Sequence, residues 1–199
     1  MSLIVRPLGR EELARRLPDL ARLRIRVFAD WPYLYDGDEA YERRYLQPYL
    51  DSPQALVVGA FDGDRLVGAA TGTPMEDHAD EFTQALAARD LAPDTVFYCA
   101  ESVLLPEFRG QGAGHRFFDL REDHARRLGR RWSAFCAVVR PDTHPARPPD
   151  YRPLDPFWRA RGYEPLPGAV ARFRWRDHGE AEETAKPLQV WLRDLDRPA

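Results

Sequence analysis

The sequence has only two cysteines, no long apolar run and no large excess of either charge. The cysteines, Cys99 and Cys136, both lie inside apolar, strand-like runs of the 199-residue chain. We therefore expect buried thiols in a reducing compartment rather than a disulfide framework. Neither cysteine has the spacing of a metal site.

These absences also exclude several classes of partner. No run approaches the roughly 20 apolar residues of a membrane-spanning helix, and residues 1–6 lack the apolar segment of a secretion signal. The net charge of -3 gives no reason to expect a nucleic acid or an anionic membrane as partner. With 44% hydrophobic residues, we expect residues 1–199 to form one cytoplasmic domain with a real core.

The periodicity of apolar residues predicts alternating strands and helices. Strands are expected at residues 3–8, 55–61, 65–73, 95–105, 132–139, 169–175 and 187–192. Helices are expected at residues 11–28, 38–50, 112–128 and 157–161, with an acidic helical insertion at 76–90. Pro18 predicts an interruption or kink in the first helix, and Gly162 a C-terminal glycine after the last.

The most informative stretch joins an apolar run to a helix through a glycine-rich turn. The run ends at Pro106, and Gly110, Gly112 and Gly114 follow within a few residues. A strand, a glycine loop and a helix N-terminus present backbone N–H groups and the positive end of a helix dipole to an anion. Glycine has no Cβ, so the backbone can approach a bound group closely. The stretch therefore predicts a site for a phosphate or pyrophosphate.

The glycine spacing separates this stretch from other phosphate sites. No Gly-Lys-Ser/Thr follows the glycines, so the segment is not a P-loop. Residues 110–114 also depart from the Gly-x-Gly-x-x-Gly pattern of dinucleotide-binding folds, because residue 115 is His. A nucleotide-binding oxidoreductase is therefore disfavoured.

The stretch resembles motif A of the GNAT acetyltransferase superfamily, Arg/Gln-x-x-Gly-x-Gly/Ala. Here the motif is Arg109, Gly112 and Gly114, after the Pro-Glu-Phe lead-in usual in that family. The order of expected elements extends the resemblance over nearly all of the chain, although only motif A is specific. The resemblance implies an α/β (α+β) fold of the GNAT acyl-CoA N-acyltransferase type, with a central mixed, mostly antiparallel sheet flanked by helices.

The resemblance also implies acetyl-CoA as co-substrate and no metal. In such enzymes the loop amides hold the pyrophosphate, which assigns that role to Arg109, Gly110, Gln111, Gly112, Ala113 and Gly114. The end of the preceding strand pairs with the pantetheine arm like an added strand, which assigns Ser102, Val103 and Leu104. A plain core strand is the alternative for these three residues, and both roles are compatible.

Glu101 is the candidate general base. An ammonium must lose a proton before it attacks a thioester, and a carboxylate can take that proton directly or through a water. GNAT enzymes often have a glutamate on this strand, and Glu101 lies about one residue nearer to the glycine loop. One residue reverses the direction of a strand side chain, but a β-bulge would restore it. A strand-end carboxylate bonded to a neighbour is the alternative, and Tyr98 is the substitute if Glu101 faces away.

The general acid usual in this family is missing. It is a tyrosine four residues before the glycine of a later aromatic-x-x-x-Gly-Phe/Tyr segment, and Trp158 occupies that place before Gly162. An indole cannot usefully protonate a thiolate, so the role is not carried over. Tyr151, where an asparagine that touches the pantetheine is common, offers a hydroxyl. A thiolate with a pKa of about 8.5 is also a fair leaving group without an acid.

Two loops are candidates for the acceptor site, because loops at these places flank the acceptor cleft in the GNAT fold. Aromatic and acidic residues of the first loop suit a cationic amine: Trp31, Tyr33, Tyr35, Asp36 and Asp38. Basic residues in and beside the proline-rich loop at 141–156 suit a substrate carboxylate: Arg140, His144, Arg147 and Arg152. Together the two groups suit an amino acid or a similar zwitterion.

The sequence therefore predicts an N-acetyltransferase that uses acetyl-CoA and the primary amine of a small molecule. Direct transfer in a ternary complex is expected, because neither cysteine lies at the glycine loop as an acyl carrier. Two alternatives stay open: a protein or peptide N-acetyltransferase, and a catalytically inactive CoA-binding module, which the missing tyrosine favours. A homodimer is compatible with the resemblance. The acceptor and the acyl chain length are not specified.

Overall fold

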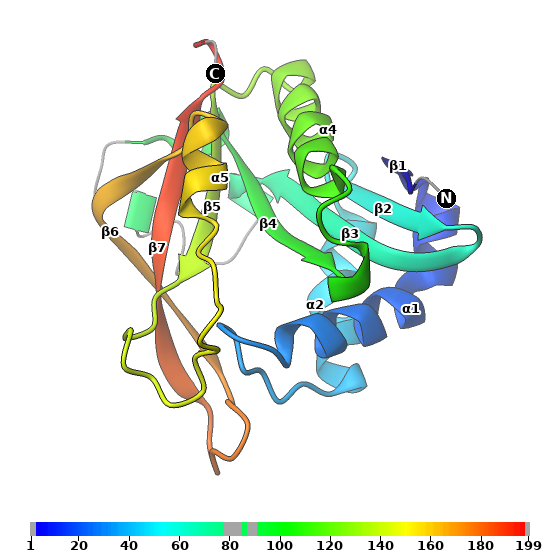
Figure 1. Ribbon diagram of the computed structural model, residues 1–199. Coiled ribbons are helices and arrows are strands. Elements are labelled where there is room, and N and C mark those ends of the chain that lie inside the picture. The colour runs from blue at the N-terminus through cyan, green and yellow to red at the C-terminus, as the bar shows by residue number, and fades with distance from the viewer. Residues whose placement is uncertain (1–2, 78–84, 87–90, 198–199) are drawn as a thin grey trace.

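The computed structural model describes residues 3–77, 85–86 and 91–197. Its centre is a seven-stranded sheet in the order β1-β2-β3-β4-β5-β7-β6, with helices packed against it (Figure 1). Neighbouring strands are antiparallel except β4 and β5, which are parallel. The predicted mixed, mostly antiparallel sheet flanked by helices is confirmed.

The helices and strands follow the predicted order. The strands are β1 (Ile4–Pro7), β2 (Leu56–Asp62), β3 (Arg65–Pro74), β4 (Val96–Leu104), β5 (Trp132–Val138), β6 (Glu164–Trp175) and β7 (Thr184–Asp194). The α-helices are α1 (Arg10–Phe28), α2 (Glu39–Asp51), α4 (Ala113–Arg127) and α5 (Asp155–Ala160). Short 3-10 turns occur at η1 (Met75–Asp77), η2 (Pro93–Thr95) and η3 (Pro106–Phe108). Most of the helix predicted at 76–90 lies outside the described residues.

Helix α1 continues through Pro18, so the interruption predicted there is absent. Proline removes one helical hydrogen bond and crowds the preceding turn. However, Leu13, Leu20 and Leu23 of this helix are all buried. Burial of one apolar face stabilises a helix in a folded protein more than intrinsic propensity does.

Strand β6 begins five residues earlier than predicted, at Glu164 rather than 169. The added segment contains Pro165 and Pro167, and proline cannot donate to a sheet ladder. In the structure β6 is an edge strand that pairs only with β7, and the register shifts between Pro165 and Val170. An edge strand with a shift in register tolerates both prolines.

The two faces of the sheet are covered by different helices. Helices α1 and α2 lie below and partly behind the sheet as drawn in Figure 1, and α4 and α5 lie in front of it. Strands β2 and β3 are buried over almost their whole length, because side chains on both faces meet a helix layer. Cys99 and Cys136 are buried free thiols, as predicted. No helix in the described part of the chain is long and apolar enough to span a membrane.

Candidate active site

The glycine loop connects β4 to α4. After η3 the chain turns through residues 109–112, and Gly110 and Gly112 have φ angles of +77° and +82°. These left-handed conformations favour glycine. A Cβ built at either position would have no atom of the described chain within 4 Å. The outer side of the loop is therefore open to a ligand.

The loop leads directly into the N-terminus of α4. Gly112 is the N-cap, no side chain caps the helix there, and the first turn has no acidic residue. His124, Arg126 and Arg127 lie in the last turn, next to the negative end of the helix dipole. The missing side-chain cap and the absence of acidic residues in the first turn leave the positive end of the helix dipole available to an anion. The Arg109 side chain turns back and donates from Nε to the Leu104 carbonyl, at 3.3 Å.

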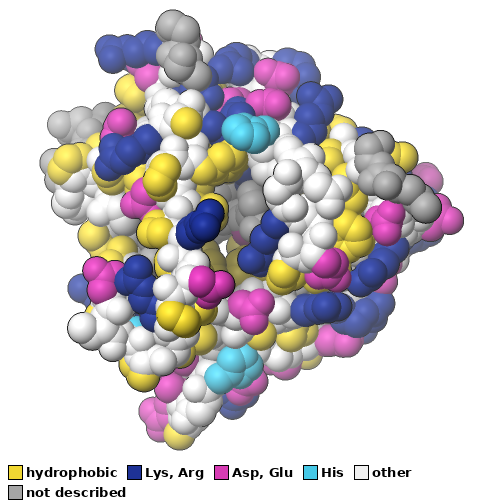
Figure 2. All heavy atoms as spheres, in the orientation of Figure 1, with side chains coloured by type: hydrophobic (Ala, Val, Ile, Leu, Met, Phe, Trp, Pro, Cys, Tyr) yellow, Lys and Arg dark blue, Asp and Glu magenta, His cyan; other side chains and the backbone are white. Residues whose placement is uncertain are grey.

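Strands β4 and β5 separate next to this loop. They pair over only three residues, from Val96 opposite Trp132 to Tyr98 opposite Ala134. Beyond that point β5 continues beside β7, while Ser102, Val103 and Leu104 of β4 pair only with β3. One backbone edge of β4 therefore faces the opening between the two strands (Figure 1). Figure 2 shows a hollow near the centre of this face, with apolar side chains inside and charged ones around it.

A bulge in β4 sets the direction of Glu101. Thr71 of β3 pairs with Glu101 and Thr73 pairs with Tyr98, so β4 has one residue more than β3 over this interval. An extra residue restores the side-chain direction that a shift of one position would reverse. Glu101 consequently points toward α1, where it meets Arg24.

Glu101 is held by two partners. Its side chain is 5% exposed, Oε2 forms an ion pair with Arg24 Nη1, and Thr71 Oγ1 donates to Oε1 at 3.2 Å. Arg24 Nε also donates to Glu42 of α2, whose side chain is fully buried. Glu101 therefore belongs to a buried charged cluster that we define as Arg24, Glu42 and Glu101.

Tyr98 lies in a cluster of buried hydrophobic residues that includes Met75, Cys136 and Trp175. It is 4% exposed. Burial raises the pKa of Tyr98 well above its ordinary value, so its hydroxyl stays protonated at neutral pH. In this state Tyr98 can donate a hydrogen bond but cannot act as a base.

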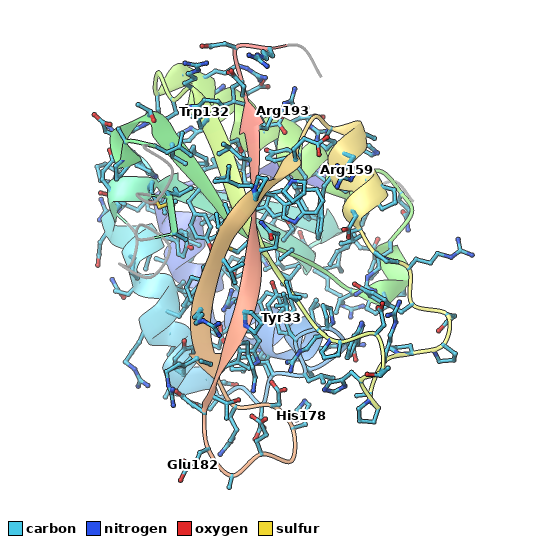
Figure 3. All side chains as sticks on the ribbon, turned by 90° about the vertical axis from the view of Figure 1, so that its left-hand side faces the viewer. Tyr33, Trp132, Arg159, His178, Glu182 and Arg193 are labelled. Atoms are coloured by element: carbon cyan, nitrogen blue, oxygen red, sulfur yellow. The ribbon has the colours of Figure 1, made fainter. Side chains whose placement is uncertain are left out.

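The two loops predicted to form the acceptor site do meet, but several of their residues are engaged elsewhere. Arg140 makes two bonds to Asp177, at 2.7 and 2.9 Å, and donates to the carbonyls of Pro32 and Tyr33. Tyr33 lies between α1 and the β6–β7 pair, above the hairpin that carries His178 and Glu182 (Figure 3). Arg140 is therefore a structural clamp and is not free to bind a substrate carboxylate, which corrects the prediction for this residue.

Other predicted acceptor residues also have structural partners. Asp38 caps α2 by accepting from Tyr41 N at 2.9 Å, and Asp36 pairs with Arg176 at 2.6 Å. Arg147 pairs with Asp142. Arg152 is exposed.

Three rings connect the loops. The Trp31 ring lies 5.0 Å from His144 and 5.9 Å from Tyr151. The Trp31 indole nitrogen is buried without a hydrogen-bond partner in the described part of the chain. Burial and then the charge of Asp155 raise the pKa of Tyr151, so its hydroxyl is protonated at neutral pH.

Trp158 serves the core. Its ring lies 5.0 Å from Phe135 and 5.1 Å from Trp191, so it packs α5 onto β5 and β7. From the sequence, Trp158 was excluded as the general acid only because an indole cannot usefully protonate a thiolate. The contacts now give it a packing role.

Arg24 and Glu42 are the residues of this site that sequence analysis missed. Arg24 lies four residues after Leu20 and four before Phe28, on the buried face of α1, and Glu42 lies four before Leu46. A charged residue at a core position of an amphipathic helix was the available signal, because charge is rarely buried unpaired.

A separate cavity of about 530 Å³ lies between α4 and α5. Its lining is charged, and Glu122 there accepts from Arg161 and Arg193 at 3.0 and 2.7 Å. The lining includes neither Glu101 nor residues 109–112. In the described residues no group of three or more His, Cys, Asp or Glu side chains could hold a metal ion.

A family model described as "Acetyltransferase (GNAT) family" matches residues 21–148, more than half of the chain. No curated protein matches the sequence.

Several solved structures are similar in fold. A putative acetyltransferase, yncA from Salmonella typhimurium with acetyl-CoA, superposes with a TM-score of 0.60 at 13% identity, covering 100% of this chain and 97% of that one. The ribosomal-protein-alanine N-acetyltransferase from Brucella melitensis has a TM-score of 0.61 at 13% identity, with 96% and 99% covered. An aminoglycoside 6′-acetyltransferase type Ii has a TM-score of 0.58 at 17% identity, with 98% and 99% covered. At these identities the similarity shows the fold alone.

Proposed function

Because the chain belongs to the GNAT acetyltransferase family, we propose that it transfers an acetyl group from acetyl-CoA to the primary amine of a small molecule. In this proposal residues 1–199 form one such domain, which acts in the cytoplasm. The opening between β4 and β5, which ends at an uncapped helix N-terminus, is the observation that supports the donor most directly.

The donor would lie along this opening. The amides of residues 109–114 would hold the pyrophosphate, because the loop is open and α4 contributes its positive end. The free edge of β4 at Ser102, Val103 and Leu104 would pair with the amide-containing pantetheine arm. This arrangement would bring the thioester toward the bulge beside Glu101.

Glu101 would act as the general base. It takes a proton from the acceptor ammonium, directly or through a water, and the neutral amine then attacks the thioester carbonyl. The C–N bond forms and the C–S bond breaks, and the second nitrogen proton leaves with the CoA thiolate or to solvent. Tyr98 and Tyr151 have protonated hydroxyls that can donate hydrogen bonds, and the thiolate can also leave unaided.

The first test is ligand-dependent stability. A ligand that binds only the folded state raises the melting temperature, so acetyl-CoA should raise it while NAD and ATP at equal concentration should not. Absence of a shift with acetyl-CoA would remove the donor assignment.

A second assay separates an enzyme from a CoA-binding module. Release of free CoA is measured with acetyl-CoA and a panel of small amines, and then with peptides that carry a free N-terminal or lysine amine. Release with small amines supports the proposal, and release with peptides alone identifies a protein or peptide acetyltransferase. Binding of acetyl-CoA without release with any acceptor identifies an inactive module, the alternative that Trp158 favours.

A further inference from the structure

The cluster of Arg24, Glu42 and Glu101 contains more negative than positive charge. The three residues are 4%, 0% and 8% exposed, and one guanidinium contacts both carboxylates. With both carboxylates ionised, the cluster carries one surplus negative charge. An uncompensated buried charge is costly, so a further cation or proton is needed to complete the cluster.

One carboxylate oxygen is left for that cation. Both oxygens of Glu101 are engaged, by Arg24 and by Thr71. Glu42 Oε2 accepts from Arg24 Nε, whereas Glu42 Oε1 is buried without a hydrogen bond of ordinary geometry among the described residues. The Tyr35 hydroxyl lies beside Glu42: burial, then the negative charge of Glu42 and a hydrogen bond to it, raise the pKa of Tyr35. A neutral hydroxyl does not compensate the surplus charge, so an ammonium would take its place at the carboxylate.

A row of tyrosines on α2 connects the cluster with the surface. Tyr41, Tyr45 and Tyr49 follow at intervals of four residues, with ring centroids 6.4 and 6.2 Å apart. Their exposure falls from 36% at Tyr41 to 6% at Tyr49. The Tyr45 ring already lies 4.1 Å from the guanidinium carbon of Arg24. Aromatic faces attract cations, so this wall suits a positively charged ligand.

Three of the positive groups that could bind a substrate carboxylate are already engaged. Arg140 is clamped to Asp177 and to two backbone carbonyls, and Arg147 is paired with Asp142. Arg24 is already shared between two glutamates. An acceptor carboxylate beside the amino group would therefore add negative charge to a cluster that has a surplus of it.

We infer that the acceptor is a cationic amine without a carboxylate beside its amino group, and that Glu42 is the residue that selects it. This inference rests on the proposed function and narrows its acceptor. The ammonium would donate to Glu42 Oε1, complete the charge of the cluster, and lie within reach of Glu101 for deprotonation.

Matched pairs of acceptors test the class. Each pair is an amine and the amino acid that differs from it only by the carboxylate: 2-phenylethylamine with phenylalanine, 3-methylbutylamine with leucine, and 1,5-diaminopentane with lysine. CoA release is measured at saturating acetyl-CoA. For at least one pair, kcat/KM for the amine should exceed that for the amino acid by about tenfold or more, because like-charge juxtaposition opposes binding.

Variants of two glutamates on the same helix test the residue. Glu42→Gln should raise KM for the preferred amine about tenfold with a smaller change in kcat, since it removes the surplus charge and keeps the Arg24–Glu101 pair. Glu39→Gln is the matched control, because the Glu39 side chain is 50% exposed and its Oε2 lies 3.6 Å from Nη2 of the exposed Arg43. It should leave both constants unchanged.

The outcomes separate the two proposals. If acetyl-CoA gives no melting shift, the proposed function fails and the inference fails with it. If acetyl-CoA binds but no amine is preferred over its amino acid, the inference is overturned while the donor assignment stands. A folded Glu42→Gln variant with an unchanged KM overturns the role of Glu42. If that variant does not fold, the wild-type comparison of pairs still decides the acceptor class.

Discussion

At the scale of single residues, buried charges determine how the site is held together. Glu101 pairs with Arg24 of α1, which in turn binds Glu42 of α2. Its position therefore depends on two helices as well as on its strand. Arg140 similarly joins the loop after α1 to the turn after β6. The two residues have different consequences when replaced.

Replacement of Glu101 by glutamine should impair chemistry more than folding. Glutamine cannot accept the ammonium proton, and loss of a general base lowers rates by about 10²–10⁴-fold. The fold should persist, because Arg24 then pairs with Glu42 in a balanced pair. The measurement is kcat for CoA release at saturating amine, with the acetyl-CoA melting shift as control. A rate equal to wild type would remove Glu101 from the proposed role.

Replacement of Arg140 by alanine should destabilise the whole fold. The change leaves the buried Asp177 carboxylate with a weaker set of partners and removes donors to two backbone carbonyls. Removal of one member of a buried ion pair costs about 3–5 kcal/mol. Lys186 also contacts Asp177, at 3.4 Å, so we expect the lower part of that range in a denaturant titration.

Arg147→Ala is the matched control for Arg140→Ala. Its partner Asp142 is 91% exposed, and exposed pairs contribute about 0–1 kcal/mol. Equal losses of unfolding free energy in the two variants would contradict the clamp.

At the scale of elements, strand β4 and the loop after it carry most of the proposed site. Their order was predictable, because a β-prone run, three glycines and a helical pattern follow one another in the sequence. The bulge was anticipated only from the resemblance. Its presence depends on pairing with β3, which supplies Thr71 and Thr73 opposite Glu101 and Tyr98.

Replacement of Gly112 by aspartate should abolish the acetyl-CoA melting shift. The residue has a φ of +82° and caps α4, so a carboxylate there would repel an anion from the helix N-terminus. The strain of a non-glycine residue at positive φ adds about 1–2 kcal/mol of destabilisation.

Gly129→Asp is the matched control for Gly112→Asp. Gly129 follows the C-terminal end of α4, with a φ of +71° and no described atom within 4 Å of a built Cβ. It should show similar strain and a normal melting shift with acetyl-CoA. A normal shift in Gly112→Asp would mean that the loop does not hold the pyrophosphate.

At the scale of the whole molecule, buried tyrosines pack against the sheet. Four tyrosines in the core, Tyr33, Tyr49, Tyr98 and Tyr163, have pKa values raised by burial. Their hydroxyls therefore remain protonated in the folded state well above the ordinary pKa of 10.0.

Stability should consequently fall at alkaline pH. Above about pH 10 the unfolded chain releases tyrosine protons that the folded chain retains, so the unfolding free energy decreases as pH rises. Below that pH these groups contribute no slope. Each tyrosine that is protonated only in the folded state contributes about 1.4 kcal/mol per pH unit.

Denaturant titrations between about pH 8 and about pH 11, a range that brackets the ordinary tyrosine pKa, would measure how the unfolding free energy changes with pH. Tyr163→Phe should reduce this pH dependence by the contribution of one tyrosine, because Tyr163 is fully buried. An unchanged slope in Tyr163→Phe would contradict the expectation.

The sequence by itself determined the element order, the glycine loop and the family. These features are local: periodicity shows in neighbouring residues, and the loop needs glycines at positions that the backbone conformation demands. The burial of both cysteines was equally visible from the apolar runs around them.

Only the tertiary structure decided which charged residues are free to act. From the sequence, Arg140, Asp36 and Arg147 were candidates for binding a substrate. In the structure Arg140 pairs with the distant Asp177 and Asp36 with the distant Arg176, while Arg147 pairs with Asp142 of its own loop. Arg24 and Glu42 gave little sign of forming a site with Glu101, because α1, α2 and β4 meet only after the chain folds. Electrostatic partners depend on distance in space, and a linear sequence does not contain that distance.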